Sequence, residues 1–157
     1  MVQKNILVSI LINNYNNRLY INKCIESCLV QSYKNLEIVI YDDNSNDGSQ
    51  KIIKKIKDKR VKKIFNKKKL HKTGALNQLE SIYKSVDKSK GEIIFLLDGD
   101  DFFLKNKISY IINLFKKDKN LNFIQDSPYY FFPDQNIKIK KELGNKFFTM
   151  HTWPYFF

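Results

Sequence analysis

Three carboxylates stand within four consecutive positions of this sequence, in the run Asp98-Gly99-Asp100-Asp101. Like charges at this spacing repel one another and lose solvation when they are even partly buried, so a cation is their natural partner. Hard divalent ions such as Mg²⁺ and Mn²⁺ prefer carboxylate oxygens and leave positions open for phosphate oxygens. The run therefore predicts a metal-phosphate site, with Asp98, Asp100 and Asp101 as candidate ligands. A solvated acidic turn is the alternative.

Two further polar segments come directly after apolar runs. Residues 13–17 contain one aromatic side chain, Tyr15, whose ring could stack on a nucleobase or pack on its neighbours in a turn. Asp42 and Asp43 open the second segment, and two adjacent acids at a strand end exceed what a turn requires. A carboxylate accepts hydrogen bonds only, so it could bind a base N–H or a ribose hydroxyl.

A third candidate is the basic stretch before residue 74. Lys72 or His71 could add counter-charge for a diphosphate if a helix begins there, because helix N-termini favour anions. Solvated basic residues in a lysine-rich chain are the alternative.

Hydrophobic periodicity predicts the elements that position these residues. Apolar runs predict strands at 6–12, 36–41 and 92–97, and the shorter pattern at 61–65 predicts a weaker strand. The run 93–97 predicts a strand buried on both faces. Apolar stripes predict helices within 21–29, 52–56, 76–86 and 108–115, with Ser49 as a cap of the second. A further strand is expected at Phe123 and Ile124. This alternation is typical of βαβ units, so we expect an α/β fold whose mostly parallel sheet binds ligands at the carboxyl ends of its strands.

Composition narrows the function classes. The 157 residues predict one globular domain, and 43% of them are hydrophobic. The net charge is +12, but only Arg18 and Arg60 are arginines, so nucleic acid is not the expected partner. Attraction to an anionic membrane surface or substrate stays open. No apolar run is long enough to span a bilayer, and Cys24 and Cys28 read as reduced core residues. We expect a cytoplasmic protein, with peripheral contact at the inner membrane face as an extension.

Several ordered motifs together resemble the N-terminal part of a family-2 glycosyltransferase with the GT-A fold, a Rossmann-like sheet with helices on both faces. The resemblance covers about residues 5–117. It rests on segments 8–16, 25–33 and 36–49, and on Lys90-Gly91-Glu92 leading into Asp98-Gly99-Asp100-Asp101, which matches the D-x-D segment of that family.

The resemblance implies a role for each matching residue. Tyr15 would contact the nucleobase, Asp43 would read the base with Asp42 beside it, and Asp98 would lie near the ribose. Asp100 would bind Mg²⁺ or Mn²⁺, and Asp101 would support the metal or the acceptor side. The nucleotide-sugar-binding set is completed by Asn13, Lys72, Asn77 and Gly99. The expected activity is metal-dependent, inverting transfer from a nucleotide-diphosphate sugar, with a UDP-sugar favoured, to an unknown acceptor in surface polysaccharide or glycoconjugate synthesis.

Two departures from the family pattern qualify this expectation. The helix before the D-x-D strand has Asn77 but lacks the arginine that often precedes the asparagine. No carboxylate after Asp101, Asp126, Asp134 and Glu142 included, matches the general base of the family, so no catalytic base is assigned. We expect a nucleotide-sugar-binding core at residues 1–117 and the start of an acceptor-side region at 118–157, which ends in aromatics and reads as truncated. The alternatives to truncation are a compact variant of the family and a partner subunit that covers the tail. The alternative to an enzyme is a catalytically silent binding module.

Overall fold

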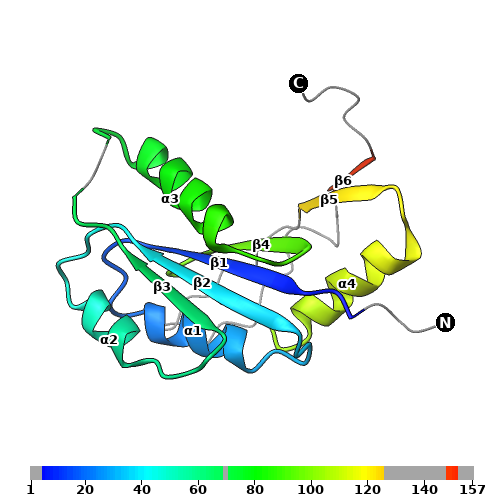
Figure 1. Cartoon of the computed structure of the whole chain (residues 1–157), viewed down its shortest axis with the longest axis horizontal. Helices are drawn as coiled ribbons and strands as arrows, with labels where there is room; N and C mark the ends of the chain where they lie inside the picture. The colour runs from blue at the N-terminus through cyan, green and yellow to red at the C-terminus, as the bar shows by residue number, and fades with distance from the viewer. Residues whose placement is uncertain (1–4, 69–70, 126–147, 152–157) are drawn as a thin grey trace, which may run out of the picture. The chain divides into compact units, whose positions relative to one another are not determined.

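A computed structural model describes residues 5–68, 71–125 and 148–151, with side-chain surroundings given for the first two ranges (Figure 1). The chain divides into two compact units, Met1–Ser109 and Tyr110–Phe157, which we describe separately.

The first unit is a parallel four-stranded sheet in the order β3-β2-β1-β4. Its strands are β1 (Val8–Asn14), β2 (Leu36–Asp42), β3 (Val61–Phe65) and β4 (Ile93–Asp98), and the helices between them are α1 (Ile21–Leu29), α2 (Ser49–Lys55) and α3 (Gly74–Lys88). Figure 1 shows α1 and α2 together on one face of the sheet and α3 on the other. The expected α/β sheet with helices on both faces is confirmed.

The apolar runs of β1 and β2 lie in the middle of this sheet, between the two helix layers. Every residue of β2 is buried, and so are all but one of β1. The stripe of α1 packs inward through Ile21, Ile25 and both cysteines, which are free thiols. Burial raises the pKa of Cys28 to about 12, so its thiol is an inert part of the core.

The structure corrects the expectation for the strand before the acidic run. β4 is an edge strand of the described sheet and is not buried on both faces, since Ile94 is 41% and Leu96 56% exposed. Phe95 and Leu97, which point to the opposite face, are buried. α3 packs mainly on β1 and β2.

Two helix starts also differ from the expectation or refine it. Gly48, with φ of 100°, occupies the cap position of α2, and Ser49 is the first helical residue. α3 is capped by Thr73, whose hydroxyl accepts from the Leu76 amide at 3.4 Å. The face of α3 that packs on the sheet is made of Asn77, Ser81 and Ser85, while the apolar side chains of Leu76, Leu79, Tyr83 and Val86 are exposed.

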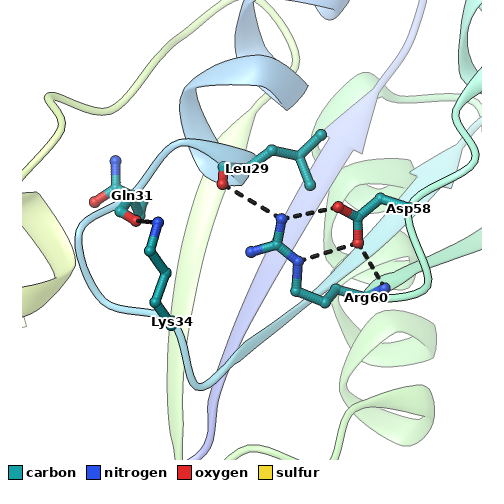
Figure 2. Close-up of polar contacts among 5 residues, drawn as sticks. All are labelled: Leu29, Gln31, Lys34, Asp58 and Arg60. Carbon is teal, nitrogen blue, oxygen red and sulfur yellow. Dashed lines mark hydrogen bonds and ion pairs between the residues drawn. The ribbon is translucent and has the colours of Figure 1, made fainter.

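The C-terminal end of α1 is held by the segment before β3. The guanidinium of Arg60 donates to both carboxylate oxygens of Asp58, at 3.0 and 2.8 Å, and to the carbonyl of Leu29 at 3.4 Å (Figure 2). A cation is favourable at this end of a helix. The hydrogen bonds from Arg60 lower the pKa of Asp58 to about 2.

The helix α4 (Lys107–Lys117) runs across the boundary between the two units. The second unit also holds an antiparallel pair, β5 (Leu121–Gln125) and β6 (Phe148–His151), which confirms the strand expected at Phe123 and Ile124. The division after residue 117 stays a prediction, and Asp126, Asp134, Glu142 and the aromatic end 152–157 lie outside the described residues. Among the helices of the described part, none is long and apolar enough to cross a membrane.

Candidate functional site

The carboxyl ends of three parallel strands bring the polar segments together. Asn13 at the end of β1 is paired in register with Asp98 of β4 on one side and with Tyr41 of β2 on the other. The strand order reverses at β1, because β2 and β3 lie to one side and β4 to the other. Ligands of open α/β sheets bind at such a switch point, outside the carboxyl ends of the strands.

A pocket opens at this edge. It is lined by residues from β1, the loops after β1 and β2, and the first turn of α3: Asn13, Tyr15, Asp43, Gly74, Asn77 and Gln78. The structure therefore brings together four predicted binding residues that come from three separate segments of the sequence, namely Asn13, Tyr15, Asp43 and Asn77. Gly74 and Gln78 were not predicted.

Asp43 lies in the pocket wall with a fixed orientation. Its carboxylate accepts a hydrogen bond from the Asn66 side chain at 2.8 Å, and its main-chain N–H donates to the Asn14 carbonyl at 2.9 Å. The carboxylate is therefore presented to the pocket as a pre-oriented hydrogen-bond acceptor. Tyr15, from the loop after β1, is 45% exposed and lines the same pocket.

Asp42 lies behind this wall and is fully buried. Its carboxylate accepts from the side chains of Asn14 at 2.7 Å and Gln50 at 2.8 Å and from the amide of Ser45 at 2.9 Å. These bonds anchor the loop that carries Asp43, so Asp42 supports the pocket from within the fold. Asn14, the neighbour of the candidate Asn13, was not named as a site residue from the sequence. Because successive side chains of a strand point to opposite faces, a polar residue beside Asn13 could have been expected to serve the other side of the sheet.

The side chain of Asn77 forms hydrogen bonds to the loop before α3. Its amide donates to the carbonyls of His71 and Thr73, both at 2.9 Å, and accepts from the His71 N–H at 3.1 Å. Asn77 therefore holds the loop that carries Lys72 against the first turn of the helix. Lys72 itself is exposed in that loop and is not one of the residues that line the pocket.

The acidic run begins where β4 ends, next to the pocket. Gln78 links the two, because its side-chain amide donates to the Asp98 carboxylate at 3.0 Å. Gly99 follows in a tight fit, with its N–H donating to the Asn13 carbonyl at 2.8 Å. A Cβ at this position would come within 2.7 Å of the Asn14 side-chain oxygen and 2.9 Å of the Asn17 side-chain nitrogen, so only glycine lets the run lie this close to the end of β1 and the loop after it.

Asp100 and Asp101 are exposed at the same edge. Burial, and then the charges of Asp100 and Asp98, raise the pKa of Asp101, which indicates that both neighbouring carboxylates lie close enough to act on it. Within the described residues no group of three His, Cys, Asp or Glu side chains is arranged to hold a metal ion alone. The oxygen donors suit Mg²⁺ or Mn²⁺, which commonly take one or two carboxylates and complete their coordination with substrate phosphates.

A family model described as Glycosyl transferase family 2 matches residues 9–156. Among curated relatives, the UDP-Glc:alpha-D-GlcNAc-diphosphoundecaprenol beta-1,3-glucosyltransferase WfaP of Escherichia coli is 41% identical over 128 residues, which is 82% of this chain and 48% of the relative. An uncharacterized glycosyltransferase of Haemophilus influenzae is 39% identical over 109 residues, 68% of this chain and 41% of the relative. The chain spans less than half the length of these two relatives.

Solved structures share the fold at low sequence identity. S. aureus TarS 1-349 in complex with UDP-GlcNAc matches with a TM-score of 0.65 and 18% identity, over 83% of this chain and 36% of that one. The mannosyltransferase PcManGT from Pyrobaculum calidifontis, in complex with GDP-Man and Mn²⁺, matches with a TM-score of 0.60 and 16% identity, over 73% of this chain and 33% of that one.

Proposed function

We propose that the first unit of this chain, which belongs to glycosyl transferase family 2, binds the sugar donor of a transfer reaction. The donor would be a nucleotide-diphosphate sugar. The observation that carries this proposal is the pocket at the strand ends, which Tyr15 and Asp43 both line and where Gln78, also in its wall, donates to the Asp98 carboxylate. Stacking on Tyr15 and hydrogen bonds to Asp43 would hold the base, and Asp98 would accept from the ribose. The donors named for WfaP and for the TarS complex favour a UDP-sugar.

Mg²⁺ or Mn²⁺ would bind between the acidic run and the diphosphate. Asp100, with Asp98 and Asp101 close by, would supply carboxylate oxygens, and the ion would neutralise the charge that develops on the departing diphosphate. Lys72 would add positive charge near the same group, and Gly99 would let the run approach the end of β1, where Asn13 lies. The Mn²⁺ in the PcManGT complex supports this proposal by analogy of fold alone.

The reaction would be an inverting transfer. An acceptor hydroxyl oxygen forms a bond to the sugar carbon that carries the diphosphate, the bond from that carbon to the diphosphate breaks, and a base takes the hydroxyl proton. The base is not assigned, since the only acid after Asp101 in the described residues is Asp118, which belongs to the second unit. We propose an acceptor in surface polysaccharide or glycoconjugate synthesis. The lipid-diphosphate acceptor named for WfaP supports a reaction at the inner face of a membrane.

A catalytically silent nucleotide-sugar-binding module is the second candidate, and the lack of an assigned base favours it. Incubation of the purified chain with UDP-sugars and Mn²⁺ separates the two. Donor hydrolysis or transfer of sugar supports the enzyme. Mn²⁺-dependent UDP binding without turnover supports the module, and absence of UDP binding contradicts both.

A further inference from the structure

Two polar side chains are buried on α1 and just after it. Gln31, just past the end of the helix, is fully buried, and Ser27, one turn earlier, is 8% exposed. Buried amides and hydroxyls cost free energy unless they are hydrogen-bonded, so the partners of these two side chains indicate what they are for.

The side chain of Gln31 bonds to the main chain that follows the acidic run. Its Nε2 donates to the Leu104 carbonyl at 2.9 Å and also to the Ser27 carbonyl at 2.9 Å. Its Oε1 accepts from the Ile108 N–H at 3.2 Å. One amide thus satisfies a carbonyl and an N–H of a segment more than 70 residues away in the chain.

Ser27 and Cys24 extend this contact toward the acidic run. The Ser27 hydroxyl accepts from the Phe103 N–H at 3.1 Å and donates to the Cys24 carbonyl at 2.7 Å. The Cys24 thiol lies 3.5 Å from the Asp98 carbonyl, in a weak hydrogen bond. Residues 100–102 therefore lie between anchors at Asp98 and Gly99 on one side and further anchors from Phe103 onward on the other.

We propose that Gln31, together with Ser27, is a positioning residue that fixes the course of the acidic run, so that Asp100 and Asp101 face the diphosphate. This inference rests on the donor-binding function proposed above. Asp100 and Asp101 are exposed and repel each other, and the turn that holds them is closed by the Asp101 N–H on the Asp98 carbonyl at 3.0 Å. Hydrogen bonds that fix the main chain before and after the acidic run would keep these carboxylates in place even without the cation.

A neighbouring residue provides a matched control. The Lys34 ammonium donates to the main-chain carbonyl of Gln31 at 2.9 Å and leaves the side-chain amide alone (Figure 2). Lys34→Met therefore removes a contact to the same residue without touching the bonds to Leu104 and Ile108. Gln31→Met removes those bonds and keeps the length of the side chain.

The test measures UDP affinity by calorimetry, with Mn²⁺ and with EDTA, for the wild type, Gln31→Met and Lys34→Met. For Gln31→Met the gain in affinity from Mn²⁺ is expected to fall by about tenfold, the usual loss when the support of a metal ligand is removed. Affinity in EDTA, which reports contacts to the base and ribose, should stay within about twofold of the wild type. Amide hydrogen exchange at Ile108, whose N–H loses its acceptor in Gln31→Met, should become faster, and Lys34→Met should match the wild type.

The outcomes separate this inference from the proposed function. A wild type whose UDP affinity does not depend on Mn²⁺ contradicts the proposed metal site and the inference with it. A wild type with the Mn²⁺ gain, and a Gln31→Met variant with the same gain, overturns the inference alone. Equal losses in Mn²⁺ and in EDTA show a general structural role and also overturn it. If Gln31→Met does not fold, Ser27→Ala, which frees the Phe103 amide, is tested instead. It should likewise lose the gain in affinity from Mn²⁺ and keep its affinity in EDTA.

Discussion

Asp100 is exposed one residue beyond the glycine that brings the acidic run against the loop after β1. Asp100→Asn keeps the shape of the side chain and removes its charge. The Mn²⁺-dependent part of UDP affinity should fall by at least about tenfold, or ~1.4 kcal/mol, because a neutral amide oxygen is a much weaker ligand for a divalent ion. Calorimetric titration with and without EDTA measures this.

The control for this substitution is Asp87→Asn, which removes one acid from the exposed surface of α3, away from the pocket. It should leave UDP affinity and stability unchanged within about 0.5 kcal/mol. The metal assignment is contradicted if Asp100→Asn keeps the full Mn²⁺ effect while it remains folded.

Tyr15 is expected to act through its ring. Tyr15→Ala should weaken UDP binding by about 1–3 kcal/mol, the usual value of stacking between a base and an aromatic side chain, and should do so equally with Mn²⁺ and with EDTA. Tyr15→Phe keeps the ring and should bind within a few tenths of a kcal/mol of the wild type. Unchanged binding by Tyr15→Ala would return this residue to a packing role in its loop.

The amino ends of the strands depend on one buried acid. Glu37 of β2 accepts from the Ser9 hydroxyl at 2.7 Å and from the Lys90 N–H, and pairs with Lys62 at 2.7 Å. The Ser9 hydroxyl in turn accepts from the Gly91 N–H at 2.8 Å. Glu37 thus fixes the point at which the chain enters β4, the strand that delivers the acidic run.

This arrangement predicts a pH-dependent contribution to stability. Burial opposes ionisation of Glu37, but the bonds from Lys62, Ser9 and Lys90 outweigh it and lower the pKa. Because the folded-state pKa lies below the ordinary value of about 4.3, the stabilisation is present above that pH and is lost as pH falls through the lower value. Glu37→Gln should cost about 1–3 kcal/mol of unfolding free energy at neutral pH.

Urea unfolding at several pH values measures this prediction. The gap between wild type and Glu37→Gln should narrow as the pH is lowered from about 5 to about 3. Glu26→Gln, on the exposed side of α1, serves as the control and should stay within about 0.5 kcal/mol of the wild type. A gap that does not change with pH would show that Glu37 acts through shape and not through its charge.

At the scale of elements, hydrophobic periodicity predicted the strands and helices, which local sequence largely determines. The alternation of runs and stripes placed four parallel strands and their helices, because apolar side chains at period 2 or 3.6 must be buried against one another. It could not show which strand lies at the edge, so β4 was expected in the middle of the sheet. Periodicity also could not foresee that α3 packs through Asn77, Ser81 and Ser85, because polar contacts at the strand ends decide that orientation.

The same limit applies to the site. Tyr15, Asp43 and Asp98 were predictable because each belongs to a polar segment that directly follows an apolar run, where a turn alone does not need that residue type. Gln78 and Gln31 were not, because each stands in a helix or at its end and becomes relevant only through a partner at Asp98 or Leu104. Long-range pairs of this kind depend on the packed fold and leave no local pattern.

The whole molecule carries a formal charge of +12, supplied almost entirely by lysine. We predict that it binds vesicles containing anionic lipid at low ionic strength and is released by salt, because screening shortens the reach of surface charges to about 3 Å at 1 M. Co-sedimentation with anionic and with neutral vesicles measures this. Equal recovery with both kinds of vesicle would contradict the proposed contact with a membrane surface.

The central claim is that the strand-end pocket and the acidic run together hold a nucleotide diphosphate through a divalent ion. Calorimetric titration of the wild-type chain with UDP, in Mn²⁺ and again in EDTA, tests it most directly. We predict saturable binding that is at least about tenfold tighter with Mn²⁺, equivalent to ~1.4 kcal/mol. The same affinity in both solutions, or no binding in either, would contradict it.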